Sequence, residues 1–121
     1  NGGHVAIQGI TIKNELFNRY RTSEDFIQKY IFPGGFLPSI DQIKRLAKQN
    51  HLNLEHIHSY SQDYAKTLFT WKKNFFRTWD KILPLGFDDY FKRMWEFYLS
   101  YCEAGFKSKN IDLIQFSMQN K

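Results

Sequence analysis

An apolar, β-branched run near the start of the chain restricts the folds open to it. Val5-Ala6-Ile7-Gln8-Gly9-Ile10-Thr11-Ile12 shows little alternation of apolar and polar residues. Such a run is typical of a strand covered on both faces, the usual state of a strand in a parallel α/β sheet. Because a turn at positions 1–3 leads directly into it, we expect the strands that precede it in the sheet to lie outside this chain.

The remaining segments predict helices and strands in an α/β order. Ser39 and Gln42 have the spacing of a capping box, which predicts the start of a helix, and Asn50-His51 ends this helix after about position 49. Ser23, followed by two acids, predicts the start of another helix that reaches position 30. The other predicted elements are a helix at 14–20, a strand at 52–60, a helix from 61 or 63 to 82, a helix from 88 that Gly105 stops, and a strand at 111–118. We therefore predict an α/β fold with three strands and an incomplete sheet.

A Pro-Gly loop at positions 30–39 combines rigidity with apolar side chains. It holds two prolines and two adjacent glycines among aromatic residues, in a chain that is 18% aromatic. Proline restricts the backbone, and glycine allows close approach to it, whereas ordinary connecting loops are polar and mobile. We interpret this loop as one wall of a pocket.

The charge and the single cysteine limit the classes of partner and compartment. A net charge of +5 favours an anionic partner, either nucleic acid or an acidic membrane surface. The basic residues are nevertheless scattered, so solvated helix faces are the simpler interpretation. One cysteine excludes an intrachain disulfide and favours a reducing compartment. No apolar run approaches the roughly 18 residues that span a bilayer, and we expect no signal peptide.

Two pairs of polar residues are candidates for catalysis or ligand binding. Gln8 and Thr11 lie at or near the carboxyl end of the first predicted strand, where open α/β sheets bind ligands. Asp63 and Tyr64 lie just inside a predicted helix start, which attracts anions. Structural hydrogen bonding explains Gln8 equally well, and a capping acid beside a packing tyrosine is the simpler account of the second pair.

Other candidates are weaker. His56 and His58 share a strand face, but no third residue has the spacing of a metal ligand, so surface histidines are the better interpretation. Cys102 falls on an apolar helix side, where a small buried residue is the default. The sequence contains no GxGxxG, P-loop, CxxC or HExxH motif, so we predict neither a metal site nor a cofactor site within it.

These residues, taken in order, resemble the C-terminal half of the cyclopropane-fatty-acyl-phospholipid synthase family, which are S-adenosylmethionine-dependent methyltransferases. The Tyr-Ile-Phe-Pro-Gly-Gly block at 30–35 is the most specific match. The resemblance covers essentially the whole chain through Gly2-Gly3, Gln8 to Ile12, Asp25 to Gly35, Leu37-Pro38-Ser39, Asp63-Tyr64, Thr67-Leu68, Trp71, Phe91 to Trp95, Tyr98-Leu99, Tyr101 to Phe106, Ile111-Asp112 and Gln115.

The resemblance implies the C-terminal part of a class I methyltransferase (Rossmann-like) fold, in which the last strand runs antiparallel between its neighbours. It also implies methyl transfer from S-adenosylmethionine to the double bond of an unsaturated phospholipid acyl chain, with a bound bicarbonate accepting a proton as a ring closes. Tyr64 matches a bicarbonate-binding tyrosine, and Gln8 replaces a bicarbonate-binding histidine. An amide can donate to the anion but cannot be protonated as imidazole can, so simple methylation stays open as an alternative to ring closure.

From this resemblance we expect residues 1–121 to be a fragment of one methyltransferase domain, inactive without its cofactor-binding half. The acyl pocket is expected to use Tyr30, Phe32, Pro33, Gly34, Gly35 and Cys102. We expect a cytoplasmic protein on the inner face of an anionic membrane, with no nucleic acid as partner and self-association through an exposed strand edge. The alternatives are a non-catalytic acyl-chain binding protein and a basic interaction or nucleic-acid-binding module.

Overall fold

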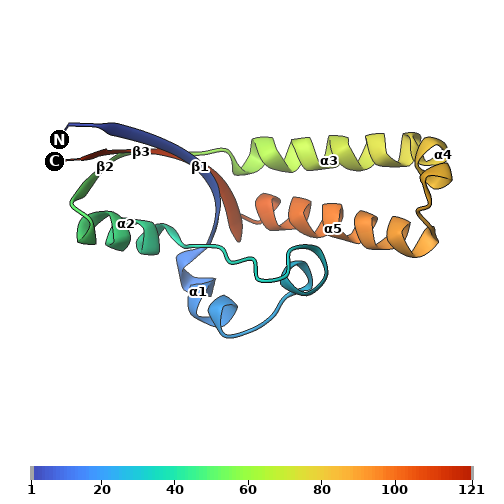
Figure 1. The fold of residues 1–121 in the computed structure, drawn as a ribbon, viewed down its shortest axis with the longest axis horizontal. Helices are drawn as coiled ribbons and strands as arrows, with labels where there is room; N and C mark the ends of the chain where they lie inside the picture. The colour runs from blue at the N-terminus through green and yellow to red at the C-terminus, as the bar shows by residue number, and fades with distance from the viewer. Residues whose placement is uncertain (1, 121) are drawn as a thin grey trace.

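The computed structural model describes residues 2–120 as three strands with helices packed beside them (Figure 1). The α/β class and the three predicted strands are confirmed. In chain order the elements are β1 (His4–Ile12), α1 (Asn14–Arg21), the π-helical turn η1 (Ile27–Ile31), α2 (Ile40–Gln49), β2 (Leu52–Ser59), α3 (Ser61–Arg77), α4 (Trp79–Ile82), the 3₁₀ turn η2 (Leu83–Leu85), α5 (Asp89–Lys107) and β3 (Ile111–Asn120).

The sheet has the order β1-β3-β2, and β3 is antiparallel to both neighbours. Strands β1 and β2 therefore run parallel to each other, as the resemblance implied for the last strands of the methyltransferase fold. Pairing with β1 is regular, whereas pairing with β2 shifts at an irregularity between Leu54 and His56. Within residues 2–120, the outer edges of β1 and β2 have no partner strand, so self-association through such an edge stays a prediction.

The expectation that the first strand is covered on both faces is wrong for the part of the molecule described. Residues 4–8 of β1 are exposed, including the apolar side chains of Val5 and Ile7, and only Thr11 of the strand is buried. The reason is that the helices of this chain pack against the carboxyl end of β1 and leave the rest uncovered (Figure 1). The apolar side chains of β1 therefore favour burial, which the packing within residues 2–120 does not provide.

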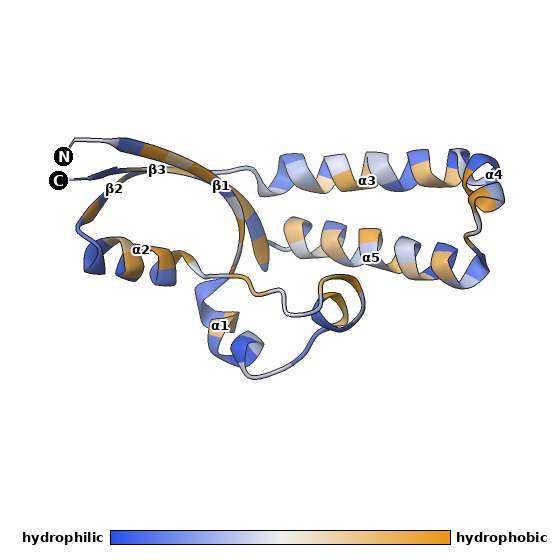
Figure 2. Cartoon of the chain, in the orientation of Figure 1, coloured by the Kyte–Doolittle hydropathy of each residue, from blue (hydrophilic) through white to orange (hydrophobic). Residues whose placement is uncertain are grey.

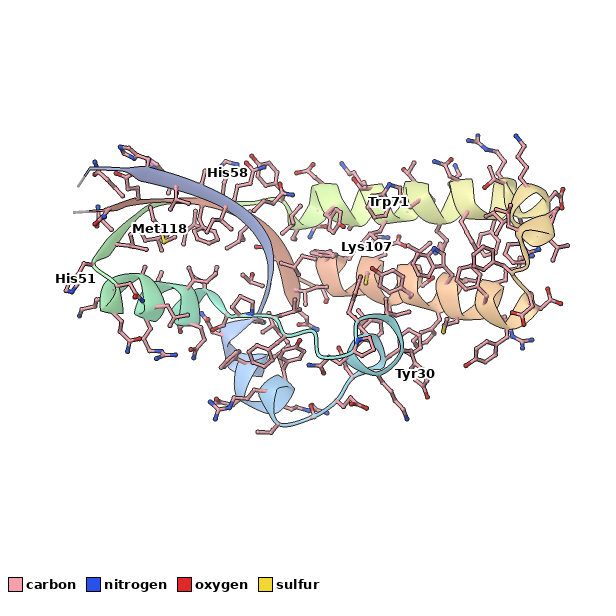
Figure 3. The ribbon with its side chains drawn as sticks, in the orientation of Figure 1. Tyr30, His51, His58, Trp71, Lys107 and Met118 are labelled. Carbon is pink, nitrogen blue, oxygen red and sulfur yellow. The ribbon has the colours of Figure 1, made fainter. Side chains whose placement is uncertain are left out.

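Two apolar clusters hold the elements together. On one side of the sheet Ala47 of α2 packs with Ile114, Phe116 and Met118 of β3, and Met118 points from the sheet toward α2 (Figure 3). The other cluster joins α3 and α5, which lie side by side as a long hairpin. Its buried members are Ala65, Leu68, Leu99, Cys102 and Phe106.

Helix ends follow some predicted signals and depart from others. Ser39 caps α2 by accepting a hydrogen bond from the Gln42 amide at 3.2 Å, as predicted. Ser23 caps no helix, because its hydroxyl instead donates to the Arg19 carbonyl at the end of α1, at 2.8 Å. The turn that follows begins at Asp25, which accepts from the backbone amide of Gln28 at 2.8 Å.

The two helices of the hairpin also end differently from prediction. The helix predicted from 61 to 82 divides at Thr78, whose hydroxyl donates to the Asn74 carbonyl at 2.8 Å. Gly105 does not stop α5, which continues to Lys107. A Cβ at position 105 would lie 2.9 Å from the Ile111 side chain, so the glycine permits close packing of helix against strand.

An ion pair cluster joins the two long helices. Glu103 of α5 is nearly buried, 3.5 Å from the Lys72 ammonium of α3 and 3.0 Å from that of Lys107. Burial opposes ionisation of Glu103, but the hydrogen bond from Lys107 and the charge of Lys72 outweigh it, so the pKa of this carboxyl is lowered.

We expect the carboxylate of Asp88 to stabilise the fold as the cap of α5, because it accepts from the Phe91 amide at 2.9 Å. Asp88→Ala should lower the free energy of unfolding by about 1 kcal/mol. The matched control is Asp89→Ala, one residue on, which removes an exposed acid of the first turn and leaves that hydrogen bond in place. Urea denaturation checks both, and an equal loss in the two variants would contradict a specific capping role.

We also expect a pH dependence from Glu103. Because its pKa is lower in the folded than in the unfolded state, its stabilising contribution is complete above the ordinary glutamate range and is lost as the pH falls through the folded value. Urea unfolding at stepped pH should show this loss, and Glu103→Gln should remove that part of the pH dependence. A variant with an unchanged pH profile would show that the ion pairs contribute nothing.

Candidate functional site

An apolar cavity of about 340 Å³ lies between the α3–α5 hairpin and the Pro-Gly loop. Ile10 of β1, Leu68 of α3 and Phe106 of α5 form part of its wall, and Ile27, Phe36, Leu37 and Ile111 add further apolar surface. The polar groups at the wall come from Tyr20, Asp25, Gln28, Tyr64, Tyr98 and Cys102. Elements far apart in the sequence therefore converge on one partly open, mostly apolar space, which is the usual form of a small-molecule site.

The Pro-Gly loop forms one wall of this cavity through only some of its residues. Phe32 and Gly35 line it, as does Cys102 of α5. Tyr30 instead lies on η1 beside α5, where it lines a separate hollow (Figure 3). Pro33 and Gly34 line neither hollow: Gly34 has φ +80°, so it turns the chain, and the Gly35 amide donates to the Phe32 carbonyl at 2.8 Å.

Side chains that the sequence interpretation missed hold the loop in place. The Gln28 side-chain amide donates to the Gly35 carbonyl at 3.1 Å, and the Tyr20 hydroxyl accepts from the Leu37 amide at 2.9 Å. Asp25 and Gln28 also cap each other reciprocally. The Asp25-x-x-Gln28 spacing is the same capping signal that identified Ser39 and Gln42, so the sequence did contain a sign of this turn.

Burial raises the pKa values of two tyrosines and the cysteine at the wall. Burial raises the pKa of Tyr98 to about 12, and the neighbouring Cys102 thiol adds to the shift. Burial also raises the pKa of Cys102 to about 11, with a smaller contribution from the charge of Asp25. The pKa of Tyr64 is raised by burial and then by Cys102. Near neutral pH the three groups therefore present uncharged surface, which suits an apolar ligand.

Gln8 and Tyr64 do not line the same hollow; each lines one of two adjacent hollows. Gln8 lies in the middle of β1, not at its carboxyl end, and lines an open hollow of about 530 Å³ on the sheet with Tyr60. Tyr64 lines the apolar cavity one helical turn further on, and its amide donates to the Tyr60 carbonyl at 2.9 Å. Ile10, two residues after Gln8 and so on the same face of β1, also reaches the cavity. Gln8 thus borders the cavity from outside.

Hydrogen bonding differs at the two candidate residues. The Gln115 side-chain amide donates to the side-chain oxygen Oε1 of Gln8 at 2.9 Å across the sheet. This contact leaves the side-chain N–H groups of Gln8 free to donate. The Tyr64 ring packs against Phe106 with ring centroids 4.7 Å apart, and its hydroxyl has no hydrogen-bond partner within residues 2–120. Thr11, the other candidate residue of that strand, is buried near its end.

The histidines lie on the exposed sheet. His56 and His58 line the hollow that contains Gln8, and the His58 ring lies 4.9 Å from that of Tyr60 (Figure 3). Residues 2–120 hold no group of three histidine, cysteine or acidic side chains with the geometry of a metal site. Over the same residues, no helix combines the length and apolar character that crossing a bilayer requires.

The thiol of Cys102 should react slowly with alkylating reagents. With its pKa raised to about 11, the thiolate is scarce at pH 8, and iodoacetamide should modify it about a hundredfold more slowly than an exposed cysteine. Mass spectrometry of timed samples measures the rate, with the same protein in urea as the control. Equal rates in the folded and unfolded protein would contradict the buried, neutral thiol described above.

Known proteins are similar to this chain in sequence and in fold. The sequence model of mycolic acid cyclopropane synthetase matches residues 1–116. The tuberculostearic acid methyltransferase UfaA1 of Mycobacterium tuberculosis is 43% identical over 118 residues, 97% of this chain and 28% of that protein. The cyclopropane-fatty-acyl-phospholipid synthase of Escherichia coli K12 is 37% identical over 92 residues, 76% of this chain and 24% of that protein.

A solved crystal structure is similar to this chain in fold. The crystal structure of the mycolic acid cyclopropane synthase CmaA1, complexed with SAH and CTAB, superposes with a TM-score of 0.83 at 28% identity, covering 98% of this chain and 44% of that one. The fold is therefore that of the C-terminal part of a methyltransferase, as the resemblance implied. Since the family's sequence model extends over nearly the whole length, the chain belongs to the mycolic acid cyclopropane synthetase family.

Proposed function

We propose that this chain is the acyl-binding part of an enzyme that transfers a methyl group from S-adenosylmethionine to the double bond of an unsaturated phospholipid acyl chain. The enzyme would work at the cytoplasmic face of the membrane. The observation that carries the proposal is the apolar cavity between the Pro-Gly loop and the hairpin. Family membership and the names of the relatives, which include a fatty acyl phospholipid synthase, support the same substrate class.

The cavity has the chemistry that an acyl chain needs. Phe32, Leu68 and Phe106 provide apolar contact, and each methylene group removed from water contributes about 0.8 kcal/mol. The neutral Tyr98 and Cys102 add no buried charge that would repel hydrocarbon. Gly35 allows the tight turn of the loop, because a Cβ there would lie 2.9 Å from the Phe32 carbonyl oxygen.

The described residues do not fit the cofactor itself. Dinucleotide and nucleoside sites in open sheets use a glycine-rich turn between a strand and a helix. Here β1 passes through Lys13 into α1, and β2 passes through Tyr60 into α3, so neither strand within residues 2–120 ends in such a turn. We place the cofactor site outside this chain, and residues 1–121 alone should transfer no methyl group.

Gln8 and Tyr64 suit a small anion at the border of the cavity. The contact from Gln115 occupies the side-chain oxygen of Gln8 and leaves the side-chain N–H groups for other partners. The Tyr64 hydroxyl is protonated near neutral pH and can donate as well. We propose that these donors help to hold bicarbonate, with the remaining contacts coming from outside this chain.

The identity of residue 8 bears on the product. Once the alkene electron pair has bonded to the new methyl carbon, the other alkene carbon is positively charged. Loss of a proton from the methyl group closes a cyclopropane ring, whereas loss from a neighbouring chain carbon leaves a double bond beside a methyl branch. Gln8 cannot carry a proton as an imidazole can. We propose the branched product, and the name of the relative that is 43% identical, a methyltransferase, supports it.

A test uses the whole protein with ¹³C-methyl-labelled S-adenosylmethionine and vesicles of monounsaturated phospholipid. We expect one labelled carbon per modified acyl chain by mass spectrometry, and NMR of the product should distinguish a methyl branch from a ring. Gln8→Leu should lower the turnover at least tenfold, because it removes the donor to the anion. The matched control is Gln119→Leu, which alters a glutamine of the same sheet outside both hollows.

Three results would count against the proposal. Absence of methyl transfer by the whole protein would reject the enzyme and leave non-catalytic acyl binding. A ring as sole product would reject branching, and equal activity of Gln8→Leu and Gln119→Leu would remove Gln8 from the site.

A further inference from the structure

The α3–α5 hairpin ends in an exposed apolar turn far from the sheet. The turn consists of Leu83, Pro84, Leu85, Gly86 and Phe87, here called the apolar tip. Leu85 is 74% exposed, the highest value for a large apolar side chain within residues 2–120. Figure 2 shows the apolar colour of this turn at the end of the molecule opposite the chain termini.

The tip is held in shape by its own backbone and by the aromatic residues beneath it. Pro84 lies in the 3₁₀ turn, Gly86 has φ +98°, and the Gly86 amide donates to the Leu83 carbonyl at 3.2 Å. Beneath it Trp79 is buried and lies 5.6 Å from Phe75, ring to ring. The apolar side chains of the tip therefore project outward because the space beneath them is already filled.

Basic residues outnumber acidic ones in the segments that flank the tip, and these basic residues are here called the basic rim. From Lys73 to Arg93 the sequence carries five basic residues against three acidic ones. The Lys92 ammonium lies over the rings of Trp79 and Phe76, at 5.1 and 5.8 Å from their centroids. Of the three acids, Asp88 caps α5, so the positive end of that helix partly offsets its charge. An apolar projection with a basic rim complements an anionic surface that has an apolar interior.

We propose that the apolar tip inserts into the surface of an anionic phospholipid bilayer. This inference rests on the proposed function, because an enzyme that modifies phospholipid acyl chains has to reach the bilayer. A convex apolar turn with basic and aromatic neighbours, among them the exposed Tyr90, matches the interfacial zone of a membrane, where aromatic rings and cations are favoured. The tip also lies away from the unpaired edge of β1, where further strands would extend the sheet (Figure 1).

The position of the tip relates docking to the cavity. The same two helices that meet at the tip line the cavity at their other ends, through Tyr64 and Leu68 of α3 and Tyr98 and Cys102 of α5. Insertion at the tip would thus bring the cavity to a fixed distance from the bilayer surface.

The test measures sedimentation of the whole protein with vesicles, without methyl donor. We expect binding to phosphatidylglycerol–phosphatidylethanolamine vesicles and weak binding to phosphatidylcholine vesicles. Leu85→Asp should weaken binding to the anionic vesicles at least tenfold, because it replaces an inserting apolar side chain by an acid. The matched control is Leu46→Asp, at an exposed leucine of α2, which should bind as the unaltered protein does.

A second pair of variants tests the basic rim. Lys81→Gln with Arg93→Gln should weaken binding and reduce its salt dependence, whereas Lys44→Gln with Lys48→Gln on α2 should leave both unchanged. Equal binding by the Leu85→Asp and Leu46→Asp proteins would overturn the proposal. So would a melting temperature lowered by Leu85→Asp alone, because that would show the tip to be covered by protein.

The vesicle-binding test of the apolar tip can fail or succeed independently of the methyl-transfer test of the proposed function. Vesicle binding requires no turnover, so a protein that binds through the tip but transfers no methyl group would reject only the proposed function. Conversely, Leu85→Asp should keep its methyl transfer to detergent-dispersed phospholipid while losing transfer to vesicles. Equal activity of this variant and the unaltered protein on vesicles would reject the docking surface alone.

Discussion

Strand β3 hydrogen bonds along both of its edges, to β1 from the beginning of the chain and to β2 from its middle. Both α2 and the α3–α5 hairpin pack against residues of β3, through Phe116 on one side and Leu113 on the other. Because every layer contacts this strand, the early and late parts of the chain become ordered together. Such long-range pairing also means that the sheet forms only after most of the chain is present.

The cavity is a consequence of this arrangement. Antiparallel β3 brings the end of α5 back beside β1, so Ile111 and Phe106 meet Ile10 at one wall. The Pro-Gly loop then closes the opposite wall, held by Gln28 and Tyr20 rather than by its own prolines. The arrangement places the side-chain amide of Gln8 next to an apolar interior that carries neutral hydroxyl and thiol groups.

Local structure could be predicted from the sequence where a single interaction determines it. The Ser39 cap at the start of α2 followed from spacing alone, because a capping hydrogen bond involves residues three positions apart. The same kind of reasoning failed at Ser23 and Gly105, where neighbouring groups competed. Ser23 found the carbonyl of Arg19, and Gly105 served the approach of Ile111 instead of ending its helix. The prediction that both faces of β1 are buried was also wrong within residues 2–120. An apolar sequence indicates that a strand favours burial, but it does not show which segments pack against it.

Residue identity alone was enough to establish the family resemblance and the α/β class, since these depend on patterns that are local or ordered along the chain. The order of the strands in the sheet was implied only by the resemblance. The separation of Gln8 from Tyr64 into adjacent hollows, the absence of Tyr30, Pro33 and Gly34 from the cavity wall, and the exposure of the apolar tip all depend on distances between distant segments. Those distances follow from how β3, the hairpin and the loop pack against one another. Packing is a property of three-dimensional neighbours, and a one-dimensional pattern does not specify them.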